Sequence, residues 1–111
     1  MIIALGDVYA QIPRLEEVRR LMRETQRRTR EQPGCLSYTF AETLDDPGHF
    51  ILAQEWRDRT ALEGHYRSEA FADYQAKVKL LLVRDSELRI SEVQDSVRPV
   101  ASPEGDPHQG E

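Results

Sequence analysis

The sequence has only one cysteine and no long apolar run, which excludes an internal disulfide and argues against a membrane-spanning helix. Cys35 alone cannot form an internal disulfide, which suits the reducing cytoplasm. No apolar stretch approaches the ~20 residues of a membrane-spanning helix. Asp7 also interrupts the apolar start MIIALGDVYA before a signal-peptide core could form. We therefore expect a cytoplasmic protein with no membrane partner.

Cofactor-binding motifs are also missing from the sequence. The chain has no GxGxxG, P-loop, HExxH or CxxC motif, and its three histidines, His49, His65 and His108, are scattered along it. A length of 111 residues predicts one small domain, which leaves few places to hold a cofactor. The sequence therefore carries no motif that points to a metal ion or an organic cofactor.

An excess of basic residues is absent as well. The formal net charge of -5 argues against a nucleic-acid partner. The segment from Arg14 to Arg30 is nevertheless basic, with seven Arg and three Glu. Its arginines are interleaved with glutamates at helical spacing, and no aromatic residue lies among them to stack on bases. This pattern favours a solvated helix face, so we expect no nucleic-acid partner.

The chain does contain a regular succession of strand and helix patterns. Alternating apolar residues indicate strands, and apolar residues three and four apart indicate helices. Two alternating runs flank the turn Asp46-Pro47-Gly48, which predicts a hairpin. Asp58 and Ser68 are suited to cap two short helices. The expected strands are 2–11, 35–41, 49–56 and one within 85–95, and the expected helices are about 13–32, one after Asp58, and one from Ser68 to about 83.

This order, β-α-β-β-α-β, is the split unit of ferredoxin-like α+β folds, in which helices cover one face of a four-stranded antiparallel sheet. The other face would also be apolar, because Ile51 and Ala53 alternate with the aromatic set of their strand. Packing that face against a second copy would bury it, so we expect a homodimer. Residues 1–95 are assigned to this domain, and 96–111 to a Pro- and Gly-rich tail, disordered unless a partner subunit holds it.

A family resemblance runs through the centre of the chain, from Glu31 to Phe71, in EQPGCLSYTFAETLDDPGHFILAQEWRDRTALEGHYRSEAF. This segment resembles the antibiotic biosynthesis monooxygenase family of dimeric α/β-barrel proteins, which includes quinol monooxygenases. The flanking elements have the order and length expected of that family from Met1 to about Asp95. The residues that carry the resemblance are Pro33, Gly34, Cys35, Leu36, Tyr38, Asp46, Pro47, Phe50, Glu55, Trp56, Leu62, His65, Ser68 and Phe71.

The resemblance implies a monooxygenase that oxidises a quinol or polyphenolic aromatic with O2 and needs no flavin, haem or metal. A deprotonated quinol or naphthol can itself reduce O2, so the protein need only bind it, remove a proton and stabilise the anion. Under this hypothesis His65 or Asp7 is the catalytic base. The substrate pocket would be lined by Trp56, Tyr38, Phe40, Phe50, Leu52, Phe71 and Tyr74.

Each candidate also has a purely structural interpretation. His65 ends a short helix, where the dipole favours its protonated form and where a histidine can simply cap a free carbonyl. Asp7 lies in mid-strand and is a base only if its face looks into the pocket; otherwise it sits in water or pairs with an arginine. Trp56 and the other aromatics can be core alone. Ala70 stands where the family often has a second histidine, so a mechanism that uses two imidazoles is not expected.

Two other functions stay open. A haem-degrading relative would need an Asn on the first strand and a Trp and a His on the later helices, where this chain has Asp7, His65 and Ala76. Haem degradation is therefore disfavoured. A small-ligand binding or isomerase domain of the same fold, without oxygenase activity, is the main alternative, because a fold alone does not fix a function.

Overall fold

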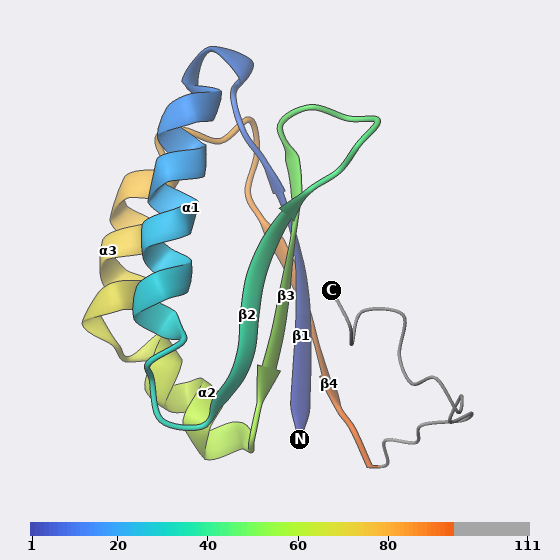
Figure 1. Ribbon diagram of the computed structural model, residues 1–111, viewed down its shortest axis with the longest axis vertical. Helices are drawn as coiled ribbons and strands as arrows, with labels where there is room; N and C mark the ends of the chain where they lie inside the picture. The colour runs from blue at the N-terminus through green and yellow to red at the C-terminus, as the bar shows by residue number, and fades with distance from the viewer. Residues whose placement is uncertain (95–111) are drawn as a thin grey trace, which may run out of the picture.

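The computed structural model describes residues 1–94 and shows the expected succession of elements. They form a ferredoxin-like α+β arrangement (Figure 1). The tail predicted at 96–111 lies outside the described residues. The strands are β1 (Ile2–Tyr9), β2 (Cys35–Glu42), β3 (His49–Trp56) and β4 (Glu87–Glu92), and the helices are the 3-10 helix η1 (Ile12–Arg14), α1 (Leu15–Thr29), α2 (Arg59–Tyr66) and α3 (Glu69–Val78).

The four strands form one antiparallel sheet in the order β2-β3-β1-β4. Helices α1, α2 and α3 all lie on one side of it (Figure 1). Successive residues of a strand point to opposite faces, so one residue set of β1 and β3 lies beneath the helices and the other on the open face. The set beneath the helices is Ile2, Ala4, Gly6 and Val8 of β1 with Phe50, Leu52, Gln54 and Trp56 of β3.

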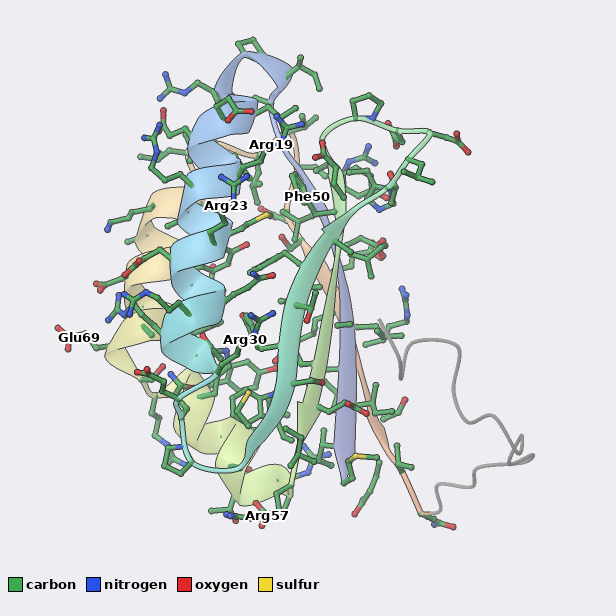
Figure 2. The ribbon with its side chains drawn as sticks, viewed as in Figure 1. Arg19, Arg23, Arg30, Phe50, Arg57 and Glu69 are labelled. Carbon is green, nitrogen blue, oxygen red and sulfur yellow. The ribbon has the colours of Figure 1, made fainter. Side chains whose placement is uncertain are left out.

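Two apolar clusters fill the space between the helices and the sheet. One surrounds the fully buried Trp56 at the α2 end of the molecule. The other joins Val8 and Phe50 of the sheet to Val18 and Met22 of α1, and Phe50 lies between α1 and the sheet in Figure 2. The apolar face predicted for the first helix therefore packs on the sheet as expected.

The helix ends are fixed by the residues that the sequence indicates. Asp58 accepts a hydrogen bond from the N–H of Ala61 at 2.9 Å, and Ser68 accepts one from the N–H of Phe71 at 3.1 Å. Gly34 in the turn after α1 has a φ of 78°, and a Cβ at this position would collide with the Cβ of Ala61. This turn therefore requires glycine, because it packs directly against Ala61 of α2.

Helix α3 ends at Val78, earlier than the predicted end near 83. Main-chain hydrogen bonds to the end of β1 explain the difference. The N–H of Gln11 donates to the carbonyl of Leu81 at 2.9 Å, and the N–H of Val83 donates to the carbonyl of Tyr9 at 2.8 Å. Residues 81–83 therefore run beside residues 9–11 instead of continuing the helix, and β1 itself stops before its predicted end at 11.

The edge strand β4 carries apolar side chains that no helix covers. Leu88 and Ile90 are paired with Gly6 and Ala4, so they lie on the helix side of the sheet. Each of the two is nevertheless 40% exposed, so the helix side of the sheet is incompletely covered at this edge. The sheet is thus open along β4, next to the cavity described below.

Candidate functional site

The main cavity lies on the helix side of the sheet, between β1, β3, α3 and the connection from α3 to β4. Its volume is about 540 Å³, which falls in the range of roughly 300–1,000 Å³ typical of small-molecule sites. Val8 and Leu52 form its floor, and Tyr38, Phe71 and Tyr74 form an aromatic wall. Residues 82–88 supply much of the remaining wall. The cavity suits a flat, largely apolar ligand.

Four of the seven predicted pocket residues line this cavity, namely Tyr38, Leu52, Phe71 and Tyr74. The other three pack behind the wall. Trp56 is fully buried and its indole N–H donates to Oε1 of Gln54 at 2.9 Å, while Gln54 itself lines the cavity. Phe40 packs against Tyr74 with ring centroids 5.6 Å apart, and Phe50 belongs to the cluster beneath α1. These three side chains support the cavity without lining it.

His65 lies in a cage of aromatic rings beside the cavity. Its ring centroid is 5.0 Å from that of Trp56, in a stacked geometry, 5.1 Å from Phe71 and 5.4 Å from Tyr38. Tyr38 and Phe71 contact both His65 and the cavity, so they separate the imidazole from the cavity by one layer of side chains. The imidazole is only 2% exposed.

Burial decides the charge of His65. It lowers the pKa of the imidazole from 6.5 to about 4, because the cage removes the water that would solvate an imidazolium. The expectation that the helix dipole would favour the protonated form is therefore wrong in sign. Desolvation inside the cage outweighs the partial charge at the end of an eight-residue helix. At neutral pH the ring is uncharged.

The two ring nitrogens of His65 have different surroundings. Nδ1 lies 2.8 Å from Oε1 of Gln32, in the turn after α1. Nε2 is buried and has no hydrogen-bond partner. On the Gln32 side lies a second cavity of about 380 Å³, which Gln32, His65 and Arg57 line, and Figure 2 shows Arg57 at this end of the molecule. Gln32 was not among the predicted site residues, because in the sequence it is only the last residue of the helix expected at about 13–32.

Asp7 lies on the open face of the sheet, away from His65 and from the main cavity. Its carboxylate is 2.9 Å from Nε2 of His49 and 3.6 Å from the guanidinium of Arg89. The ring of Tyr9 stacks on His49 with centroids 4.4 Å apart. The structure therefore does not bring the two candidate bases together, because the sheet separates them. The arrangement around Asp7 includes the arginine pairing that was the structural interpretation of this residue.

The tyrosine hydroxyls near the cavity are held in their neutral form. Burial raises the pKa of both Tyr38 and Tyr74 well above the ordinary value of 10.0. The hydroxyl of Tyr74 is buried and has no hydrogen-bond partner. Neither hydroxyl is ionised at neutral pH, so neither can act as a base.

Within residues 1–94, no group of three or more His, Cys, Asp and Glu side chains is arranged to hold a metal ion. None of the helices in the same range is long and apolar enough to cross a membrane.

The chain is thus an α+β protein of ferredoxin-like fold, with an aromatic-walled cavity beneath its helices. Within this class, the family model for antibiotic biosynthesis monooxygenase matches residues 1–77. Because the match spans more than half of the 111 residues, the chain belongs to the antibiotic biosynthesis monooxygenase family. This confirms the resemblance seen in the sequence.

Two curated relatives show how far the likeness extends. The uncharacterised protein sll1783 of Synechocystis is 27% identical over 95 residues, which are 86% of this chain and 65% of that protein. Rv0793 of Mycobacterium tuberculosis, which carries a provisional monooxygenase name, is 39% identical over 56 residues, which are 50% of this chain and 54% of that protein. The matched region thus spans less than two thirds of either relative.

Solved structures share the fold over most of this chain. The structure of Rv0793 superposes with a TM-score of 0.80 at 26% identity and covers 86% of this chain and 96% of that one. A structure from Deinococcus radiodurans, provisionally named an antibiotic biosynthesis monooxygenase, has a TM-score of 0.85 at 24% identity and covers 91% of this chain and 100% of that one. Identity as low as the latter establishes the fold alone.

Proposed function

We propose that this protein is a cofactor-independent monooxygenase that oxidises a quinol or polyphenolic aromatic with O2. Its family and the monooxygenase name of Rv0793 support a monooxygenase-type function. The observation that carries the finer proposal is the cavity of about 540 Å³ with its wall of Tyr38, Phe71 and Tyr74. A bicyclic phenol fits such a space and stacks on such walls. The free thiol of Cys35 favours the reducing cytoplasm as its compartment.

His65 is the proposed base. The phenol proton moves to Nε2, and the phenolate and imidazolium so formed attract each other, which offsets the cost of charging a buried imidazole. O2 then adds to a ring carbon of the anion, and the hydroperoxide loses water to leave a quinone. The substrate supplies all the electrons that O2 takes up. Because Tyr38 and Phe71 lie between His65 and the cavity, contact between Nε2 and the ligand requires one of these rings to move.

The test is O2 uptake by protein free of metal and flavin, with reduced menadione and a panel of naphthols. We expect turnover above the autoxidation blank and a loss of at least about tenfold in His65→Ala, equivalent to ~1.4 kcal/mol of barrier. Asp7→Ala is the control, because it removes the other candidate base from the opposite face of the sheet. Loss of turnover in Asp7→Ala alone would instead place the chemistry on the open face.

A ligand-binding or isomerase domain without oxygenase activity is the second candidate. One observation favours it: Nε2 of His65 and the hydroxyl of Tyr74 are both closed off from solvent in this structure, so the cavity can hold a ligand without touching either atom. Such a protein would bind naphthols and gain thermal stability from them, yet consume no O2. The same panel therefore separates the two candidates.

We also infer that the protein is a homodimer joined through the open face of the sheet. Ile3 and Leu5 of β1 lie beside Ile51 and Ala53 of β3 on this face, and Leu5 is 39% exposed. A second copy related by a two-fold axis presents the same apolar patch and buries both at once. The charged and polar groups at its margins, including Glu55, can then pair across the interface.

Replacement of Leu5 by aspartate is expected to convert the dimer to a monomer, because it places a carboxylate at the centre of the buried patch. Leu44→Asp is the matched control, since Leu44 is 98% exposed in the hairpin loop. Sedimentation velocity of wild type and both variants decides the matter. A monomeric wild type, or a Leu5→Asp variant that remains dimeric, would contradict an interface on this face.

A further inference from the structure

Gln32 is held firmly at the end of the second cavity by its own backbone. Its N–H donates to the carbonyl of Thr29 at 3.0 Å, and its carbonyl accepts from the N–H of Cys35 at 3.1 Å. The turn that contains it is further fixed by Gly34, whose φ of 78° few other residues would adopt. The side chain amide is therefore presented to His65 from a rigid support.

The hydrogen bond between Gln32 and His65 determines where the imidazole proton lies. The partner of Nδ1 is the amide oxygen of Gln32, at 2.8 Å, and a carbonyl oxygen only accepts. With the Gln32 amide oriented in this way, Nδ1 carries the hydrogen. In a neutral imidazole the other nitrogen, Nε2, then carries the lone pair. That nitrogen is the one without any partner in the aromatic cage.

We propose that Gln32 is a positioning residue that holds His65 in the Nδ1–H tautomer and so keeps Nε2 free to accept a proton from a ligand phenol. The chemical step rests on the proposed function, whereas the tautomer does not. An acceptor on the far nitrogen is how other proteins orient a histidine base, through a carboxylate or a main-chain carbonyl. Here a neutral amide takes that place.

The choice of an amide rather than a carboxylate has a physical consequence. A carboxylate on Nδ1 would stabilise the imidazolium and leave the histidine charged near neutral pH. The titratable groups around the ring are Tyr38 of β2 and Tyr66 of α2, and the charged group in the second cavity is Arg57. None of the residues that line this cavity with His65 is a carboxylate. The site is thus built to keep the base unprotonated.

The first test reads the tautomer directly and needs no turnover. Long-range ¹H–¹⁵N NMR spectra of the imidazoles at neutral pH are expected to show His65 of the wild type with a protonated Nδ1 and a bare Nε2. In Gln32→Leu we expect a shift toward the Nε2–H form, because the acceptor that selects Nδ1–H is gone. Gln26→Leu is the matched control, since it removes a part-buried amide acceptor that serves the N–H of Phe40 instead. A wild type in the Nε2–H form, or a Gln32→Leu spectrum identical to that of wild type, would overturn the proposal.

The second test uses O2 uptake and a charged replacement. Gln32→Leu is expected to lower kcat about tenfold or more with little change in KM, because a base in the wrong tautomer binds substrate but cannot take its proton. Gln32→Glu restores an acceptor for Nδ1–H, so we expect it to recover part of kcat and to move the acidic limb of the pH profile upward. Equal losses in both variants with an unmoved profile would show a merely structural role for Gln32. If no substrate turns over in any form, the proposed function fails while the NMR result still decides the tautomer.

Discussion

Replacement of Trp56 by alanine is expected to lower the free energy of unfolding by about 4 kcal/mol, the usual range for a fully buried tryptophan being roughly 3–5 kcal/mol. The indole is 0% exposed and stacks on His65 at 5.0 Å. Its N–H also satisfies the amide oxygen of Gln54, which would lose this partner. Urea unfolding at several protein concentrations measures the loss and separates it from any change in dimerisation.

Trp56→Phe is the control for this prediction, because it keeps a ring against His65 and removes the N–H donor. We expect it to cost about 1–2 kcal/mol, the range for one buried acceptor left unpaired together with a modest loss of packing. The cost of Trp56→Ala also shows whether Trp56 is an essential part of the core. A cost near zero for Trp56→Ala, with altered ligand binding, would mean that the indole lines a ligand site and is not an essential part of the core.

Local patterns were sufficient to predict the layers of this fold. Alternation along the strands assigned Phe50, Leu52 and Trp56 to one face and Ile51 and Ala53 to the other, and the structure agrees. The period of a strand is a property of its own backbone, so neighbouring residues determine it. The caps at Asp58 and Ser68 were equally visible, since a cap bonds an N–H only three residues away.

The cavity was less predictable because its walls depend on contacts between distant segments. The connection from α3 to β4 lines the cavity because main-chain hydrogen bonds join it to Tyr9 and Gln11, so it does not continue the helix. Nothing in the helical pattern up to 83 carries that information. Likewise, strand alternation placed Trp56 and Leu52 on the same face but could not predict that only Leu52 of the two lines the cavity.

The charge state of His65 required knowledge of the whole cage. Four elements supply the rings around it, from Tyr38 of β2 to Phe71 of α3. Position at a helix end is a local feature and suggested a protonated histidine, whereas burial is a global one and gives the opposite result. Gln32 was hidden for the same reason, since it lies 33 residues from His65 in the chain.

Acidification is expected to destabilise the protein through His65 by about 3 kcal/mol. The pKa of His65 is about 4 in the folded chain, against 6.5 for an unburied imidazole. Between these values the unfolded chain binds a proton that the folded chain does not, so the free energy of unfolding falls as the pH falls. The effect is absent above pH 6.5, grows by about 1.4 kcal/mol per pH unit within this window, and is complete near pH 4.

His65→Phe isolates this contribution, because phenylalanine keeps a ring in the aromatic cage and cannot be protonated. Urea unfolding at a series of pH values from 7.5 downward should show the difference between wild type and His65→Phe narrowing or reversing as the pH falls below 6.5. Asp58 does not confuse the comparison. The N–H of Ala61 lowers the pKa of its carboxyl below 3.8, so its own acid sensitivity lies at lower pH and is common to both proteins. Parallel curves for wild type and variant through the window would mean that the cage admits the charged imidazole, and the neutral base that we propose for the reaction would then lose its physical basis.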